Sequence, residues 1–521
     1  MNDISTLHKR AIAALNKKDY AGCHHNVMAI LQQDKYFADG YFLLAMIAAQ
    51  HQNALKATQL IEQALKLSPD NTEYMAQLAR QYVVLHRHID AKSLVDKALA
   101  LNPTNTLTLD TLGVVLNQLG LHDAALPLFQ QVVLASPDNT QFQFNLGATY
   151  KFLGQFEQAK GAFEQCIKLT PDFAKAYMSL SSLSSTTSTV LSLDNLAKIN
   201  AKSADDKLYL AHAKARLHES SGDYAGAYRE LFEAKQHKLA SLNYSFEADQ
   251  HMFDSLHQVF GEGKIKASNI ENSEAIFIVG MPRTGTTLLE RIVSNNPQVC
   301  SAGELQYFGQ LLKRLSASQS PHVIDPPTID AASHMSLDEL GQAYIDSTRV
   351  LTGSHEHFID KMPLNVLYAG FMLNALPNSK VLCLARNPLD TIISNYRQLF
   401  AVNYSYYNYA YSLESCARYY IEFVKLSQLW QRLFPDNYLT VNYEELVQDP
   451  ERVSRQIYQF CGLSWDPSCL DIASNKQAVA TASAVQVRSS ITDKNIGNWR
   501  RYDAELDKVK SLLDEAGIVW Q

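Results

Sequence analysis

The sequence has no apolar run as long as a membrane-spanning helix requires. Its first residues, 1–10, enter a polar helical pattern directly and contain no apolar core of a secretory signal. The seven cysteines are scattered and odd in number, which is typical of reduced thiols rather than of a disulfide framework. We therefore expect a cytoplasmic protein without a transmembrane segment.

An excess of positive charge is also missing. The formal net charge is −7, so no global basic field indicates a nucleic acid partner. Two metal-ligand candidates, Cys23–His25 and His86–His88, have no second pair at ligand spacing, so no metal is expected. With 521 residues, 46% of them hydrophobic and 19% charged, the chain should form two or three globular domains.

A 34-residue repeat occupies the N-terminal part of the chain. Four prolines keep the period: Pro69, Pro103, Pro137 and Pro171. Two series of small residues keep the same period: Ala45, Ala79, Gly113 and Gly147, then Ala57, Ala91, Ala125 and Ala159. Small residues allow two antiparallel helices to approach closely, and proline ends the second helix of each unit. This pattern is the signature of tetratricopeptide repeats.

We expect repeats over residues 1–183 and a further helical, repeat-like linker region over 184–262. A helix pair around Asp205–His237 is predicted because Ala215, Gly222 and Ala227 keep the phase. By analogy of fold, such an array docks a peptide or protein segment; a rigid spacer or a dimerisation arm is the alternative.

The following stretch, Ala275–Ser294, predicts a phosphate-binding loop. An apolar strand ends at Gly280, a tight turn reaches Gly285, and a helix follows. Its spacing is G-x-x-x-x-G-T-T, so Thr286 occupies the position where a nucleotide triphosphatase has lysine. The cationic residue is instead Arg283, inside the turn. The site therefore suits a compact anion such as a phosphosulfate better than a magnesium-bound triphosphate.

The motif P-R-T-G-T-T-L-L at 282–289 resembles the 5′-phosphosulfate loop of sulfotransferases that use 3′-phosphoadenosine 5′-phosphosulfate (PAPS). The branch it resembles includes protein-tyrosine sulfotransferases and bacterial enzymes fused to tetratricopeptide repeats. The resemblance spans about residues 274–502. It implies that PAPS is the co-substrate and that Arg283, Thr284, Gly285, Thr286 and Thr287 bind it.

The segment 263–521 alternates strands and helices, with candidate strands at 358–360, 381–386 and 438–443. We therefore expect an α + α/β chain. An all-helical tetratricopeptide solenoid should precede a P-loop-like α/β sulfotransferase domain with a central parallel sheet and ligands at the carboxyl ends of its strands.

A second phosphate position is predicted at the strand that ends in Arg386. An arginine fork there, with the Ser394 hydroxyl on the next helix, can clamp a phosphate. In the family this pair holds the 3′-phosphate of the cofactor. A third family cation falls at Gln398 by strict spacing, with Arg397 beside it. The resemblance also places Tyr443 against the nucleotide, although a core aromatic is the alternative.

Transfer to a hydroxyl needs a base for the acceptor proton. In the protein-tyrosine branch the base is a glutamate in a G-E setting, which Glu304 matches. The family lysine that stabilises charge at the transferred group matches Lys361. Glu290, Glu339 and Glu356 are other carboxylates, which we expect on helix or loop surfaces.

The C-terminal segment 481–502 resembles the family segment that folds over the cofactor. Aligning Trp499 with the family tryptophan places Ser483 near the sulfuryl group and makes Arg488 an additional cation. The family lysine before that tryptophan is replaced by Asn498, with Arg488 or Arg500 as substitutes.

The resemblance implies sulfuryl transfer from PAPS to a hydroxyl acceptor, which can be a peptide tyrosine, a saccharide or a small metabolite. Two alternatives remain: a nucleotide-dependent phosphotransferase, and a repeat scaffold with an inactive sulfotransferase-like domain. The missing lysine opposes the first, and the set of matched site residues opposes the second. The sequence does not define the oligomeric state.

Overall fold

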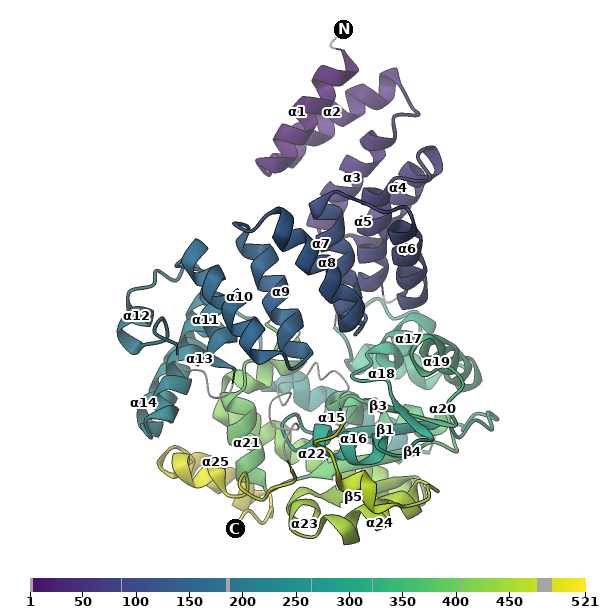
Figure 1. The fold of residues 1–521 in the computed structure, drawn as a ribbon. Helices are drawn as coiled ribbons and strands as arrows, with labels where there is room; N and C mark the ends of the chain where they lie inside the picture. Colours follow the sequence, from purple (N-terminus) through teal and green to yellow (C-terminus); the bar gives the residue numbers. More distant parts are fainter. Residues whose placement is uncertain are drawn as a thin grey trace. The chain divides into compact units, whose positions relative to one another are not determined.

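The computed structural model describes residues 3–85, 87–183, 188–263, 265–320, 322–402, 405–475 and 490–521. The chain divides into two compact units, Met1–Ala162 and Phe163–Gln521 (Figure 1). The helices predicted between residues 184 and 262 therefore lie in the second unit.

The first unit is built from antiparallel helix pairs, which confirms the prediction from the 34-residue period. Its helices are α1 (Ile4–Asn16), α2 (Tyr20–Gln33), α3 (Ala38–Gln50), α4 (Ala54–Leu67), α5 (Thr72–Val84), α6 (His88–Ala100), α7 (Thr106–Gln118), α8 (His122–Ala135) and α9 (Thr140–Phe152). Helix α10 (Phe156–Leu169) begins in the first unit and ends in the second.

The period has a further physical origin in helix capping. Asn71, Asn105 and Asn139 each stand two residues after a repeat proline and cap α5, α7 and α9. Each side-chain oxygen accepts two backbone N–H groups of the first turn. Such caps typically stabilise a helix by about 1 kcal/mol. The repeat thus fixes where one helix pair ends and where the next begins.

The small repeat residues lie where the paired helices touch. Ala45, Ala79, Ala91 and Ala125 are fully buried. At Gly113, an added Cβ would lie 2.8 Å from the Phe129 ring of α8. The close approach of α7 and α8 therefore requires glycine at this position.

The second unit begins with more helices: α11 (Ala174–Ser181), α12 (Leu193–Ala197), α13 (Ala204–Ser220), α14 (Tyr224–Ala240) and α15 (Phe246–Gly261). The pair predicted around 205–237 is confirmed as α13 and α14. Helices α13, α14 and α15 share one hydrophobic core with the sheet, because Ala215, Leu231 and Phe253 cluster with Phe277 and Val279 of the first strand.

The sheet has five parallel strands in the order β2-β3-β1-β4-β5. They are β1 (Ala275–Gly280), β2 (Val299–Ser301), β3 (His357–Lys361), β4 (Lys380–Ala385) and β5 (Tyr438–Asn442). This confirms the predicted parallel α/β sheet. The strand order reverses direction at β1, between β3 and β4, and such a switch point is where open α/β sheets bind ligands.

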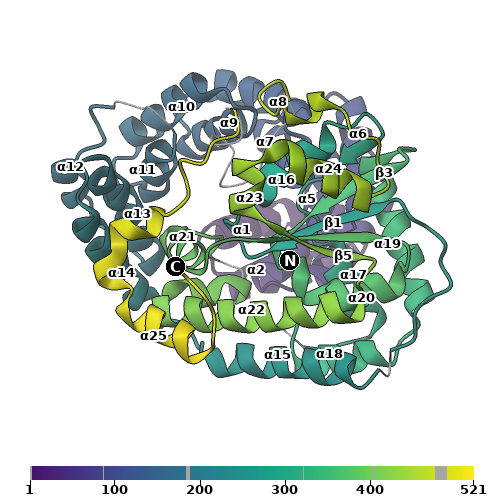
Figure 2. The same cartoon turned by 90° about the horizontal axis from the view of Figure 1, so that it is seen from below.

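Both faces of the sheet are covered (Figure 2). On one face, Phe277 and Val279 pack in the core that includes Trp430 of α22 (Leu413–Leu433). On the other, Ile276 and Ile278 pack against helices α16 (Thr286–Ser294), α23 (Tyr443–Gln448) and α24 (Pro450–Phe460). A strand buried on both faces reads as a continuous apolar run, as Ala275–Gly280 does.

The remaining helices are α17 (Tyr307–Leu315), α18 (Pro326–Ser333), α19 (Leu337–Thr352), α20 (Ala369–Ala375), α21 (Pro388–Arg397) and α25 (Asp507–Glu515). Short 3₁₀ segments are η1 (Pro363–Tyr368), η2 (Ser405–Tyr411), η3 (Pro467–Leu470) and η5 (Asn498–Glu505). Among the residues described, no helix has both the length and the apolar character needed to span a membrane.

Candidate functional site

The loop between β1 and α16 has the geometry of an anion cradle. Gly280 and Gly285 have φ angles of 149° and 107°, and Arg283 between them has a φ of 68°. A Cβ on Gly285 would lie 2.6 Å from the Tyr443 ring, and one on Gly280 would lie 2.7 Å from the Leu384 carbonyl oxygen. Gly285 also forms the N-cap of α16 without a side-chain cap. The positive end of the helix therefore faces the loop interior.

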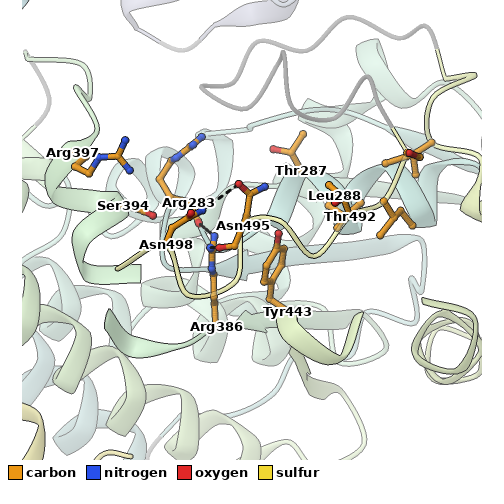
Figure 3. Close-up of a pocket in the computed structure, with 14 residues that line it drawn as sticks. Arg283, Thr287, Leu288, Arg386, Ser394, Arg397, Tyr443, Thr492, Asn495 and Asn498 are labelled. Atoms are coloured by element: carbon orange, nitrogen blue, oxygen red, sulfur yellow. Dashed lines mark hydrogen bonds between the residues drawn. The ribbon is translucent and has the colours of Figure 1, made fainter. Parts of the chain in front are cut away.

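A pocket opens beside this loop (Figure 3). It contains about 800 Å³ of space between the protein atoms, including its open mouth. Its walls come from the loop, α21, the start of α23 and the C-terminal segment: Arg283, Gly285, Thr287, Leu288, Arg386, Ser394, Arg397, Tyr443, Ile472, Ser490, Ile491, Thr492, Asn495 and Asn498.

Arg386 follows β4 directly and is buried. Its Nη1 donates to the Arg283 carbonyl oxygen (3.2 Å), and its Nη2 donates to the Asn495 carbonyl oxygen (2.5 Å). The guanidinium lies 4.6 Å from the centre of the Tyr443 ring. Its Nε is buried and has no hydrogen-bond partner. Arg386 thus joins the loop to the C-terminal segment and keeps one donor unused.

The helix α21 carries Ser394 and Arg397 three positions apart, and both line the pocket. The Gln398 amide instead donates to the Leu399 carbonyl oxygen (2.8 Å). Of these two neighbours, Arg397 lines the pocket and Gln398 is not in its lining. Arg397 is held by Glu219 of α13, with Nε–Oε1 and Nη2–Oε2 distances of 2.7 and 2.6 Å.

The pocket concentrates positive charge. Burial, together with Arg386, Arg397 and Arg216, lowers the pKa of Arg283 to about 10. A guanidinium is normally protonated far above that value. The lowered pKa reports mutual repulsion between arginines and loss of hydration, and a bound anion would relieve both.

A second cluster lies at the carboxyl end of β3, where Lys361 pairs in register with Ile278 of β1. The buried Lys361 Nζ donates to Glu304 Oε1 (2.5 Å) and lies 3.6 Å from Glu290 Oε2. Burial alone would lower the pKa of Lys361, but Glu304 and Glu290 raise it above its usual value. The Glu304 side chain stays 38% exposed, so an acceptor can reach it.

Glu290 is buried and also accepts a hydrogen bond from Ser301 Oγ (2.5 Å). The prediction of a surface position was wrong for Glu290, because this face of α16 packs over β3. Glu339 and Glu356 are exposed, as expected.

A buried residue that the sequence reasoning missed, Asp360, holds the backbone beside this cluster. Its Oδ1 accepts from Leu305 N (3.3 Å), and its Oδ2 accepts from Tyr344 Oη (2.7 Å). Burial raises the pKa of Asp360 to about 7. An aspartate inside an otherwise apolar strand, next to Lys361, is the signal that could have indicated it.

The structure brings some predicted residues together and separates others. Arg283, Gly285, Thr287, Arg386, Ser394 and Tyr443 line one pocket, whereas Thr284, Thr286, Glu304 and Lys361 do not. Thr284 and Thr286 are buried, and the Thr284 hydroxyl donates to the Met281 carbonyl oxygen (2.8 Å). Ser483 and Arg488 lie outside the described residues. Their assigned roles stay predictions.

The segment from residue 490 onward borders the pocket. Asp390 of α21 accepts from Gly497 N (2.7 Å) and Trp499 N (2.9 Å) and lies 3.6 Å from Arg386 Nη2. Trp499 itself is buried in the core. Asp390 is a further residue that the sequence reasoning missed, although its position four residues after Arg386 is a recognisable ion-pair spacing.

Two family models match the chain: the sulfotransferase family over residues 275–467 and the tetratricopeptide repeat over residues 140–173. The chain combines tetratricopeptide repeats with a sulfotransferase-family domain. The matched sulfotransferase region contains the loop, Glu304, Lys361, Arg386 and Ser394. It does not include α13 or the segment after residue 490.

The chain is similar to an uncharacterized protein of Aquifex aeolicus (strain VF5), with 31% identity over 304 residues, or 57% of this chain and 40% of that protein. It is 28% identical over 200 residues to protein-tyrosine sulfotransferase 2 of Gallus gallus, covering 37% of this chain and 53% of that protein. The alignments thus span about half of these relatives' lengths. Among solved structures, the tetratricopeptide repeat protein YrrB aligns with 39% of this chain and 96% of its own, at 19% identity and a TM-score of 0.28.

Proposed function

We propose that this protein is a sulfotransferase that moves a sulfuryl group from PAPS to a hydroxyl acceptor. The observation that carries the proposal is the pocket at the switch point of the sheet. There, a glycine-containing loop without the lysine of triphosphatases faces Arg386, Ser394 and Arg397. Two separate anion positions, one at a helix N-terminus and one at an arginine pair, suit a nucleotide that carries both a 5′-phosphosulfate and a 3′-phosphate.

The residues present fit this nucleotide. The loop N–H groups, Arg283 and Thr287 would hold the phosphosulfate, and Arg386, Ser394 and Arg397 would hold the 3′-phosphate. The unused Nε of Arg386 and the lowered pKa of Arg283 both support an anion at this position. Tyr443 lies under Arg386 and beside Gly285, where it would border the nucleotide.

PAPS would supply the sulfuryl group and a phosphate leaving group. Glu304 would take the proton of the acceptor hydroxyl as its oxygen forms a bond to sulfur, while the bond from sulfur to the phosphate oxygen breaks. Lys361, Arg283 and the loop N–H groups would hold the charge that develops on the leaving oxygen. Lys361 Nζ donates to Glu304 Oε1, which would hold the carboxylate in place for this proton transfer.

The proposal includes more than one class of hydroxyl acceptor. Similarity to a protein-tyrosine sulfotransferase favours a peptide tyrosine, with a saccharide as the second candidate. The repeats would dock the protein or peptide that carries the hydroxyl. The cytoplasmic location expected from the sequence belongs to the same proposal.

The deciding experiment is transfer of labelled sulfate from PAPS to pools of tyrosine peptides and glycans, with products identified by mass spectrometry. Calorimetry with 3′,5′-ADP, AMP and ATP with magnesium completes it. The proposal expects sulfated product and the tightest binding for 3′,5′-ADP. Tighter binding of ATP with magnesium, together with phosphorylated product, would instead support a phosphotransferase.

A further inference from the structure

The helix α13 lies upstream of the region that matches the sulfotransferase family, yet it contacts Arg397, a residue that lines the pocket. Its residue Glu219 binds Arg397 through both carboxylate oxygens, at 2.7 and 2.6 Å. The same carboxylate accepts a hydrogen bond from Tyr502 Oη (2.6 Å). Two-point contact fixes the plane of a guanidinium as well as its position. Glu219 therefore aims Arg397, which lines the pocket beside Ser394.

One turn before Glu219, the same face of α13 carries Arg216. Residues three positions apart on a helix are neighbours, so Arg216 lies next to the Glu219–Arg397 pair. Its Nη1 is buried and has no hydrogen-bond partner. Burial lowers the pKa of Arg216, and Arg397 adds to that effect while Glu219 opposes it. A buried donor of a cationic group without a partner is costly unless a ligand satisfies it.

Several positively charged side chains gather around this point. Arg216, Arg283, Arg386 and Arg397 repel one another across the pocket. Arg386 is paired with Asp390, and Arg397 is paired with Glu219. The pKa of the buried His212 is held well below its usual value by burial and by Lys235, Arg216 and Arg397, so this side chain stays neutral and does not change the balance of charge. Arg216 thus adds a further positive charge beside Arg397, which lines the pocket.

We infer that α13 is part of the nucleotide site, with Arg216 as an additional ligand of the 3′-phosphate and Glu219 as a positioning residue for Arg397. This inference rests on the proposed function, because the 3′-phosphate is part of PAPS. It extends the site beyond residues 275–467, to a helix that the 34-residue phase marks as repeat-like. The helical region then does more than present an acceptor, since it completes the recognition of the donor.

The test compares calorimetric affinities for 3′,5′-ADP and AMP in the full chain carrying Arg216→Met or Glu219→Gln. Loss of one charge-assisted contact to phosphate should weaken 3′,5′-ADP binding by about ten- to a hundredfold. Affinity for AMP, which lacks the 3′-phosphate, should stay within about twofold of wild type. Arg229→Met is the matched control, because Arg229 is exposed on the neighbouring helix α14 and its removal changes the net charge equally.

Thermal unfolding without ligand separates a binding defect from a folding defect. If Arg216→Met does not fold, Arg216→Lys keeps the charge and removes the planar fork, and it should still weaken 3′,5′-ADP binding selectively. Folded variants at residue 216 with wild-type affinity for 3′,5′-ADP would overturn the inference, as would an equal loss for AMP. Wild-type protein that binds neither nucleotide would refute the proposed function itself.

Discussion

The two units of the chain bury different kinds of side chain. Among the described residues of Met1–Ala162, the buried polar side chains are Thr58, Gln81, Thr108, His122, Gln143 and Thr149, none of which carries a fixed charge. In Phe163–Gln521 the buried side chains include Lys235, Glu290, Arg291, Asp360, Lys361, Arg386, Asp390 and Glu422. Burial of an ion costs several kcal/mol, so such groups are typical of functional sites.

This difference shows what a repeat period does and does not encode. The 34-residue phase runs through Ala215 and Ala227 into α13 and α14 and predicts both helices. In the first unit the small residues of that phase serve helix contacts within the repeats. In the second, the same phase holds helices whose other faces carry Arg216, Glu219 and Lys235 to the sulfotransferase domain. The 34-residue period predicts where the helices form, whereas the residues at the other positions of each helix determine what that helix contacts.

The largest expected effect is on folding. A fragment covering residues 1–169 should be helical and melt cooperatively, because its repeats pack on their own neighbours. A fragment covering 263–521 should lose its fixed tertiary structure, because it lacks Phe260, whose ring lies against Phe371 and Trp430. Circular dichroism and size-exclusion chromatography measure both. Extension of the second fragment to 198–521 restores α13–α15 and serves as the control. A 263–521 fragment that is stable and unfolds cooperatively would show that the sulfotransferase domain, like the repeats, folds without these helices.

The next effect is on catalysis. Glu304→Gln removes the basicity of the proposed base and keeps its shape, so kcat for sulfate transfer should fall by about a hundred- to ten-thousandfold. Lys361 would retain Glu290 as a partner, which should preserve the fold and the 3′,5′-ADP affinity. Glu339→Gln, at an exposed position, is the control. A wild-type rate in Glu304→Gln, with chemistry shown to be rate-limiting, would remove Glu304 from the mechanism.

A smaller effect is expected at the nucleotide. Arg386→Ala should weaken 3′,5′-ADP binding by about ten- to a hundredfold and leave AMP binding nearly unchanged, which calorimetry can measure. Arg386→Lys should recover part of the affinity through its charge but not the fork geometry. Equal losses for the two nucleotides would indicate that Arg386 supports the loop through the Arg283 carbonyl rather than binding phosphate.

The smallest effect concerns buried charge in α14. Lys235 Nζ donates to the Ala410 carbonyl oxygen (2.9 Å), and burial lowers the pKa of Lys235 to about 7. Between pH 7 and the usual lysine value, the folded state then binds fewer protons than the unfolded state. In this pH range the free energy of unfolding of the protein should therefore rise with pH, and Lys235 should contribute up to about 1.4 kcal/mol per pH unit.

Denaturant unfolding of wild type and Lys235→Met across pH 7–9.5 isolates this contribution, since methionine has no titrating group. The wild-type curve should climb relative to the variant as pH increases. Parallel curves would show that Lys235 keeps an ordinary pKa and that its burial carries no charge penalty.

Much of the fold was predictable from the sequence because its signals are local. The repeat prolines, the small residues and the glycines of the β1–α16 loop act within a few positions, and each predicted element formed. Arg386 and Ser394 could be placed because a strand and its following helix fix their spacing. Arg397 stands one position before Gln398, the residue that the family spacing selects. Which of these two neighbours lines the pocket depends on the orientation of the helix, and the spacing in the sequence does not reveal that orientation.

The parts that the sequence could not predict depend on long-range packing. Glu290 is buried because α16 lies over β3, and Glu219 contacts Arg397 from 178 positions away. The arrangement that brings Arg216 near Arg283 is likewise absent from any local pattern. Charge networks of this kind become visible only when distant elements are assembled.

The tether between Asp390 and the C-terminal segment has a thermodynamic consequence. One carboxylate faces a pocket arginine and also accepts the Gly497 and Trp499 amides, so any opening of that segment would be linked to occupancy of the pocket. If closure favours a ligand, the ligand must favour closure by the same factor. The exchange of those two amide protons with deuterium should therefore slow in proportion to nucleotide saturation. The exchange rates of these two backbone amides would then report the fraction of protein molecules that have nucleotide bound.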